Sequence, residues 1–419
     1  MAIGQTAEMI VPVFVPPLQA SPTQSDAPRF ADDRPGEPAT VVVVRSVGEL
    51  RQHASALQRL TETALEPNYL YEPTMLIAAL DLLADDCQVE VVLVYAPRRK
   101  NPAGPHVLCG AFPLNRPRLL GRWSLPIVSL WRHVHCVLCT PLVRDGCAEE
   151  TLETFFTWLD KESGASRAVH FPMIAGDGPF HRLLTELLYR QQRPFWIHEQ
   201  HCRALFRRSH DFDTYTQAAM PRKRRHELRR LRKRLAEQGE LEFRTLESGD
   251  DIGQWIFEFL DLENRTWKGT QQTALNSTPE GKAYFESIAR DAFARGKLMA
   301  LSMSVDGQVI AQKWNFISGD GSFAFKIAYD EQYARFSPGV LLEMENIAEL
   351  HRRDDVRWMD SCAVPDHPMI NHLWMHRRTI QSLWIATRKP GSGLLIAAAP
   401  LARWLKQAIS KLRHRRTHT

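Results

Sequence analysis

Three carboxylates have types and positions suited to accepting a proton in a group-transfer reaction: Glu263, Asp330 and Asp360. Asp330 and Asp360 fall at the ends of predicted strands, where the site of an α/β protein usually opens. A positioned carboxylate can act as a general base, and the phenol of Tyr329 can donate a hydrogen bond to a leaving group. These four residues are therefore candidate catalytic residues. The alternatives are solvated or helix-capping carboxylates and a half-buried strand tyrosine.

The segment after Asp330 is suited to binding a phosphate. A strand is followed by a short polar loop and by a helix that begins at Ser337, a favourable N-cap, and Pro338, which suits the first helical position. Helix N-termini bind anions through unpaired N–H groups, a glycine permits close approach, and an arginine adds a charge-assisted contact. An ordinary capped helix is the alternative. The candidate donor-binding residues are Arg335, Ser337, Gly339 and Val340.

Three further residues are candidates for binding the acceptor. Trp267 and Lys268 occupy a predicted turn, where an exposed ring beside a cation suits a sugar or nucleotide with its phosphate. Lys326 lies inside a predicted strand and faces either a pocket or solvent. A core position for Trp267 and a solvated face for Lys326 are the alternatives. The loop 361–374 could also line the acceptor pocket.

No metal site is predicted. The sequence HVHCVLC contains four ligand types, but its cysteines are separated by apolar residues and no second pair matches the spacing of a zinc site. Buried cysteines are common in protein cores. We therefore interpret this segment as a core strand. The four residues are His133, His135, Cys136 and Cys139.

The elements that must position these residues alternate between strand and helix patterns. In the first half, strands are predicted over 41–45, 89–95, 106–114, 131–139, 168–173 and 195–206, and helices over 47–62, 73–84, 149–162 and 180–191. In the second half, strands are predicted over 241–246, 298–305, 308–317, 322–330, 356–360 and 383–387, and helices over 251–264, 279–295, 338–351 and 370–380. Asp306-Gly307 is a strong hairpin turn pattern. The repeated order predicts an α/β (α+β) fold of two tandem units, each a mixed central sheet flanked by helices.

The chain is long enough for two domains with tails, since it has 419 residues. The first forty residues contain seven prolines and few large apolar residues, which predicts a disordered arm. A basic helix connects the two units. The predicted parts are an arm over 1–40, an N-terminal unit over 41–206, a linker helix over 207–240, a C-terminal unit over 241–390 and an amphipathic basic tail over 391–419.

The positive charge is concentrated in the linker helix. Residues 221–234 hold nine Lys or Arg and one Glu, a charge of +8, which leaves −3 for the rest of a chain whose total is +5. Such a helix can bind nucleic acid or an anionic membrane surface. It can also be a solvated linker, because its apolar stripe is narrow. The tail 391–419 is either an interfacial helix or a helix docked on its own domain.

Bulk properties indicate a cytoplasmic protein. The mean hydropathy is −0.31, no run of about twenty apolar residues occurs, and the start lacks the pattern of a secretory signal. The seven cysteines are scattered, as in reduced intracellular proteins. A peripheral contact with the inner face of the membrane or with tRNA through 221–234 stays an open alternative. The oligomeric state is not determined by the sequence.

Three segments are specific enough, taken together, to compare with known families. They are 221–243, 259–275, and the run from Tyr329-Asp330 through Tyr333 and Ser337-Pro338-Gly339 to Leu341-Leu342. This combination resembles the BioF2-like acetyltransferase domain family of the GNAT superfamily, which includes CelD-type proteins linked to cellulose and exopolysaccharide synthesis. The resemblance is strong over about 205–390 and weaker over 41–205. The family is related to the Fem-type transferases, which also pair two GNAT-like units.

The resemblance implies an acyltransferase that moves an acyl group, with acyl-CoA (acetyl-CoA) as co-substrate, to an amine or hydroxyl of a cell-envelope or exopolysaccharide-related acceptor. Such a transfer requires positioning, a proton acceptor and a donor to the oxyanion. The donor loop departs from the GNAT pattern, because its spacing is one residue longer and Pro338 has no N–H. Two alternatives stay open. One is a Fem-type aminoacyltransferase that uses aminoacyl-tRNA, and the other is a non-catalytic scaffold that binds a polyanion or membrane surface.

Overall fold

The structure, a computed structural model, describes residues 36, 40–84, 87–99, 101–119, 125–266 and 274–416. Its first half contains strands β1 (Thr40–Val44), β2 (Val89–Ala96), β3 (Val107–Asn115), β4 (Arg118–Leu119), β5 (Leu125–Pro126), β6 (Val128–Leu130), β7 (Leu142–Val143), β8 (Ala168–Ala175) and β9 (Phe195–Arg207). The helices of this half are α1 (Val47–Gln52), α2 (Ala54–Thr61), α3 (Pro73–Leu82), α4 (Ala148–Glu162) and α5 (Pro179–Arg190), with the 3-10 turn η1 (Tyr69–Tyr71).

The second half begins with α6 (Phe212–Ala219) and the basic helix α7 (Arg222–Ala236). Its strands are β10 (Leu241–Thr245), β11 (Leu298–Val305), β12 (Gln308–Ser318), β13 (Gly321–Tyr329), β14 (Trp358–Asp360) and β15 (His376–Ala386). Its other helices are α8 (Ile252–Asn264), α10 (Pro279–Ala294), α11 (Pro338–Arg352) and α12 (Ser392–Arg416), with 3-10 turns η3 (Leu275–Ser277), η4 (Glu331–Phe336) and η5 (Ile370–His372).

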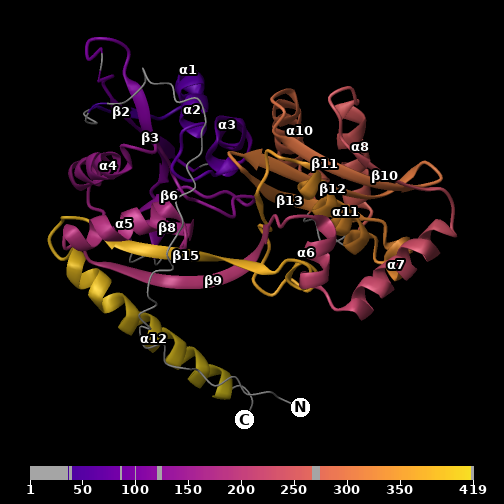
Figure 1. The fold of residues 1–419 in the computed structure, drawn as a ribbon. Helices are drawn as coiled ribbons and strands as arrows, with labels where there is room; N and C mark the ends of the chain where they lie inside the picture. The colour runs from indigo at the N-terminus through magenta and orange to yellow at the C-terminus, as the bar shows by residue number, and fades with distance from the viewer. Residues whose placement is uncertain are drawn as a thin grey trace.

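One mixed sheet runs through both halves (Figure 1). Within the described residues, its main path has the order β1-β2-β3-β6-β8-β15-β9-β14-β13-β12-β11-β10. The pairs β6–β8 and β13–β14 are parallel, and the other neighbours are antiparallel. The last strand, β15, is inserted between β8 and β9, which come from the first half. The two halves are therefore continuous in hydrogen bonding.

The apolar core follows the two faces of this sheet. One cluster joins the first-half helices to α8 and α10, and Tyr69 stacks on Phe316 across the two halves with ring centroids 5.5 Å apart. A second cluster lies on the other face of the second half, under α6, α7 and α11. The apolar stripe of α7 is buried in it, namely Leu228, Leu231 and Leu235. The core therefore ties the basic helix to the second half while its cations stay outside.

A bulge in β13 changes which side chains face the α8 side of the sheet. Lys326 pairs with Trp314 and Ala324 pairs with Asn315, so Phe325 is an extra residue. Strict alternation would place residues 325 and 326 on opposite faces. With the bulge, Phe325 stacks on Phe285 of α10 with centroids 6.0 Å apart, and Lys326 reaches α8.

The mixed α/β class is confirmed, and so is the β11–β12 hairpin, in which Asp306 and Gly307 both have positive φ. Three local predictions were wrong. Residues 131–139 contain no strand, because the Asn68 amide holds the irregular backbone through the carbonyls of Leu138 (3.2 Å) and Thr140 (2.8 Å). The helix predicted over 370–380 is only the turn η5 followed by β15, whose backbone groups pair with two strands. The helix predicted over 47–62 is interrupted at His53.

None of the helices in the described residues combines the length and the apolar character needed to cross a bilayer.

Candidate functional site

The strands β13 and β14 run side by side only briefly before they separate. In this parallel pair, Gly321 lies opposite Trp358, Ser322 opposite Met359 and Phe323 opposite Asp360. Beyond Phe323, β13 continues to Tyr329 without β14 as a partner. The chain that follows β14 turns away at Cys362, which has φ 52°. Positive φ is uncommon for a residue other than glycine, and such residues often mark functional positions. The separated strand ends leave two segments, η4–α11 and 361–375, facing each other.

A cavity of about 840 Å³ lies between the second of these segments and the α6–α7 junction, and Val340 is the one residue of α11 that lines it. This α11 cavity has a volume typical of small-molecule sites. Its wall combines the first turn of α11, the segment after β14 and the junction of α6 with α7. The lining residues include Val340, Met369, His372, Trp374, Met220 and Arg224. Of the predicted donor-binding residues, Val340 is the one that lines this cavity.

The start of α11 offers fewer free donors than an ordinary helix N-terminus. Ser337 occupies the N-cap position in a left-handed conformation with φ 55°, and its hydroxyl makes no capping bond. Its carbonyl instead accepts the N–H groups of Val340 (3.0 Å) and Leu341 (3.1 Å). Pro338 has no N–H. The Gly339 amide and the helix dipole therefore remain for an anion, since among the described residues no acceptor is recorded for that amide.

Near this helix start, Arg335 does not reach the cavity, and the cavity is lined by other arginines. The Arg335 guanidinium donates to Gln238 Oε1 (3.3 Å), packs over the Phe336 ring at 4.7 Å, and does not line the cavity. Two exposed cations line the cavity wall, Arg224 and Arg377. The Arg377 guanidinium donates to main-chain carbonyls, among them that of Trp374 (2.7 Å), whereas Arg224 was offered by the sequence only as one of nine basic residues. Tyr329 is 36% exposed and packs against Gly339, where a Cβ atom would lie 3.3 Å from the ring. Tyr329 and Gly339 therefore meet on the α11 side of the sheet.

The structure brings Glu263 and Lys326 together on the opposite side of the sheet. Lys326 Nζ lies 3.0 Å from Glu263 Oε1, and the Leu275 amide donates to Glu263 Oε2 at 2.8 Å. Glu263 is fully buried and Lys326 is mostly buried. Two residues predicted for different roles thus form one ion pair.

His135 lies beside this ion pair and was considered in the sequence only as a metal ligand. Its ring stacks on Tyr284 with centroids 5.6 Å apart and meets Phe325 edge-on at 6.1 Å. Burial and the Lys326 cation lower the pKa of His135 to about 4, against the opposing effect of Glu263. The imidazole is therefore neutral near pH 7 and can accept a proton. No local pattern identifies it, because the groups that surround it are more than a hundred residues away.

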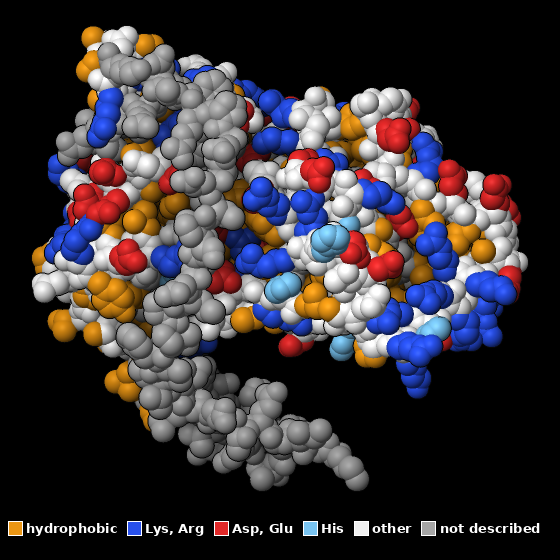
Figure 2. All heavy atoms as spheres, viewed as in Figure 1, with side chains coloured by type: hydrophobic (Ala, Val, Ile, Leu, Met, Phe, Trp, Pro, Cys, Tyr) orange, Lys and Arg blue, Asp and Glu red, His pale blue; other side chains and the backbone are white. Residues whose placement is uncertain are grey.

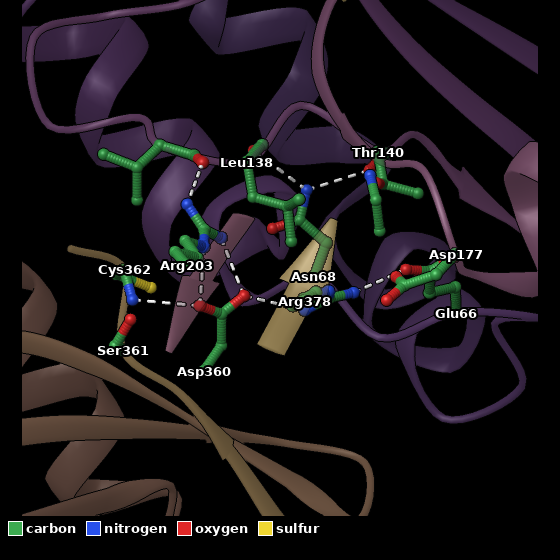
Figure 3. Close-up of polar contacts among 12 residues, drawn as sticks. Glu66, Asn68, Leu138, Thr140, Asp177, Arg203, Asp360, Ser361, Cys362 and Arg378 are labelled. Carbon is green, nitrogen blue, oxygen red and sulfur yellow. Dashed lines mark hydrogen bonds and ion pairs between the residues drawn. The ribbon is translucent and has the colours of Figure 1, made fainter. Parts of the chain in front are cut away.

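Asp360 belongs to a buried network of charges where the two halves meet (Figure 3). Its Oδ2 accepts hydrogen bonds from Arg203 Nη2 (2.7 Å) and Arg378 Nη1 (2.9 Å), and its Oδ1 accepts the Cys362 amide (2.9 Å). Arg378 also donates to Glu66 (2.5 Å). Burial by itself raises the pKa of Asp360, but the two guanidinium groups outweigh it and hold that pKa below its usual value. Two anions and two cations thus balance, and the Asp360 carboxylate is engaged on both oxygens.

The remaining predicted residues are dispersed. Asp330 caps η4 by accepting the Gln332 amide (2.9 Å), and it lies 3.9 Å from Arg265. Trp267 and Lys268 lie outside the described residues. The described part of the chain contains no group of three or more His, Cys, Asp or Glu residues that could hold a metal ion.

Figure 2 shows Lys and Arg side chains gathered over α7. Arg230 is paired with Glu227, and Arg232 stacks on Phe243 at 4.5 Å. Six cations of this helix are exposed and have no recorded ion pair with a described residue: Arg222, Lys223, Arg224, Arg229, Lys233 and Arg234. The helix is therefore a cationic surface beside the α11 cavity.

A continuous mixed sheet with helices on both faces defines a mixed α/β protein, and one pair of parallel strands separates in its second half. Residues 222–367 match the family model described as an acetyltransferase (GNAT) domain, so the predicted BioF2-like domain is confirmed. Domains of this class in general take a donor of the acyl-CoA type.

Solved structures support the same architecture. A conserved protein of unknown function from Bacteroides thetaiotaomicron is 11% identical with a TM-score of 0.51, over 83% of this chain and 100% of that chain. FemX is 9% identical with a TM-score of 0.52, over 82% of this chain and 97% of that chain. At these identities the likeness shows the fold alone, and it confirms the tandem arrangement. The comparison with curated proteins gave no match.

Proposed function

We propose that this protein transfers an acyl group from acyl-CoA, bound in the α11 cavity, to an amine or hydroxyl of an acceptor related to cell-envelope or exopolysaccharide metabolism. One observation carries the donor part. The α11 cavity is lined by the segment that follows β14, by the α6–α7 junction and by Val340 at the start of α11, beyond the point where β13 and β14 separate. The class of acceptor rests on the resemblance to CelD-type proteins.

The donor side has a limited but suitable set of groups for the phosphates of CoA. The candidate anion-binding groups at the cavity wall are the exposed guanidinium groups of Arg224 and Arg377 and the positive end of the α11 dipole. The Gly339 amide is the main-chain donor at this helix start, but Gly339 is buried and does not itself line the cavity. Tyr329, packed against Gly339, is the candidate to donate a hydrogen bond to the departing thiolate. Since only one main-chain donor remains, Arg224 contributes a large share of phosphate affinity in this proposal.

The acceptor side is assigned to the opposite face of β13. The acceptor nitrogen or oxygen attacks the thioester carbon where the strands have separated, and the C–S bond breaks. The acceptor proton passes to the neutral imidazole of His135, and the CoA thiolate, on the α11 side, takes a proton from solvent. The Glu263–Lys326 ion pair positions the strand beside that imidazole. The bulge at Phe325 is what allows Lys326 and Phe325 to share this face.

Titration calorimetry with acetyl-CoA and desulfo-CoA tests the donor assignment. Arg224→Glu should weaken binding about tenfold, since it removes a charge-assisted contact. Arg229→Glu is the matched control, because Arg229 is on the same helix but does not line the cavity. Val340→Trp should abolish binding by filling the cavity. Absence of binding at millimolar ligand, or equal losses in the two arginine variants, would contradict the assignment.

The base assignment needs a separate measurement. His135→Gln should retain CoA binding and lower turnover by about 10²–10⁴-fold, as expected for loss of general-base catalysis. Unchanged turnover would remove His135 from the mechanism. Binding of aminoacyl-tRNA without binding of CoA would instead favour the Fem-type alternative. Binding of neither donor would favour a non-catalytic scaffold.

A further inference from the structure

Among the residues whose side chains the structure describes, helix α12 contacts the rest of the protein along one side. Near its start, Ile396 is 4% exposed and packs with Ala168 and Ala386. One turn after Pro400, the Arg403 guanidinium donates to the His198 carbonyl and lies 6.0 Å from the Trp196 ring. Beyond these contacts the helix runs away from the sheet (Figure 1).

The other side of α12 exposes large apolar side chains. Leu394 is 78% exposed, Leu401 is 61% exposed and Trp404 is 62% exposed. Their spacing of seven and three residues places them on one face of an α-helix. Ile396 and Arg403 each follow a member of this stripe by two residues, which is about 200° around the helix axis. The apolar stripe therefore points away from the protein.

The charge of α12 has a single sign. The helix Ser392–Arg416 contains six Lys or Arg residues and no Asp or Glu. In the sequence, Leu405 and Leu412 continue the spacing that begins with Leu394 and Leu401. An apolar stripe on a helix whose charges are all positive is the pattern of a helix that lies in the interface of an anionic lipid bilayer.

We propose that α12 anchors this protein to the surface of an anionic phospholipid membrane, with Leu394, Leu401 and Trp404 inserted at the level of the headgroups. Tryptophan favours this level because its ring is both apolar and polar. A nucleic acid would attract the cations but would leave the apolar stripe without a partner. Pairing of two α12 helices would bring together twelve positive charges with no acid to balance them.

Vesicle flotation of the full-length protein tests this anchor. Binding is expected to vesicles of phosphatidylcholine with phosphatidylglycerol, and much less to phosphatidylcholine alone. It should weaken as salt rises from about 0.1 M to about 0.5 M, since the electrostatic part is screened. The double variant Leu401→Gln/Trp404→Gln should lower partitioning about tenfold at constant salt, because it removes inserted apolar area.

A matched control is Phe257→Gln, which changes an exposed apolar residue (66% exposed) of α8 to the same amide. This variant should bind the vesicles as the unaltered protein does, and both variants should retain the unfolding midpoint. The proposal is overturned if the anionic vesicles do not bind, or if the double variant binds as strongly as Phe257→Gln. Two further outcomes would also overturn it. If vesicle binding is absent and the double variant dissociates a dimer, the stripe is an interface between two copies of the protein. If tRNA binds and vesicles do not, the helix binds nucleic acid.

Discussion

Lys326 Nζ lies 3.0 Å from Glu263 Oε1, with the carboxylate fully buried and the lysine mostly buried. A buried ion pair adds little net stability compared with an apolar pair, but a single remaining charge is costly. The carboxylate of Glu263 also accepts the Leu275 amide, so the pair fixes the end of α8 relative to β13. This arrangement leads to a sharp prediction about single and double variants.

Lys326→Met should lower the free energy of unfolding by about 3–5 kcal/mol, because it leaves the Glu263 carboxylate buried without a cation. The double variant Glu263→Gln/Lys326→Met should recover most of that loss. Urea unfolding of the unaltered protein, Glu263→Gln, Lys326→Met and the double variant gives the coupling energy directly. Arg230→Met, which breaks an exposed pair with Glu227, is the control and should have little effect. Additive losses in the double variant would contradict the prediction.

Stability should fall on acidification because three histidines are buried in the neutral state. Burial is the largest cause in each case, with nearby positive charges or a second histidine adding to it, and the pKa falls from 6.5 to about 3 in His133 and His170 and to about 4 in His135. Between those values and 6.5 the unfolded chain binds more protons than the folded protein, so the free energy of unfolding rises with pH in this window. The stability that the neutral histidines contribute is fully present above about pH 6.5 and is lost progressively as the pH falls toward 4.

Urea unfolding at several pH values checks this dependence. His133→Gln should reduce the slope of the free energy of unfolding against pH by an amount that corresponds to at most one proton, since the glutamine cannot be protonated in either state. The unaltered protein and His133→Gln should have parallel profiles above pH 7. Equal slopes between pH 4 and 6 would show that His133 is not buried in its neutral form.

The two halves should unfold together and fail to fold apart. Strand β15 supplies hydrogen bonds to both β8 and β9, so a chain ending at residue 375 leaves two strands of the first half without their partner. We expect that chain to be unfolded or aggregated by circular dichroism and gel filtration. A chain ending at Gly391 retains β15 and is the control that should fold. A folded fragment 40–208 would contradict the prediction.

Gly321→Ala should destabilise the point where β13 and β14 separate. A Cβ atom there would lie 2.1 Å from Trp358 Cζ2, inside the indole ring's contact distance. The ring cannot easily move, because its Nε1 donates to Asp320 (3.0 Å) and Arg378 lies over it at 5.4 Å. The expected loss is about 1–3 kcal/mol, as for overpacking in a core. Adding Trp358→Leu to Gly321→Ala should recover much of the lost free energy of unfolding. Unchanged stability of Gly321→Ala would refute the close contact.

Much of the local structure follows from short-range patterns in the sequence. The β11–β12 hairpin follows from Asp306-Gly307, since two successive residues with positive φ favour that pair of residue types. The Leu228-Leu231-Leu235 stripe correctly indicates how α7 packs. The strand–loop–helix that ends at α11 was also predicted, although the hydroxyl of Ser337 does not cap it. The roles assigned to the site residues stay predictions.

The sequence by itself determined most of the order of elements, apart from the segments 131–139 and 370–380, the concentration of charge in α7 and the acetyltransferase domain, because each depends on residues close together in the chain. Only the tertiary structure decided that β15 lies between β8 and β9, that Glu263 meets Lys326, and that His135 joins them. It also enclosed Asp360 between two arginines at the junction of the halves. These relationships depend on pairing across long sequence separations and on a single bulge in β13, which local periodicity does not specify.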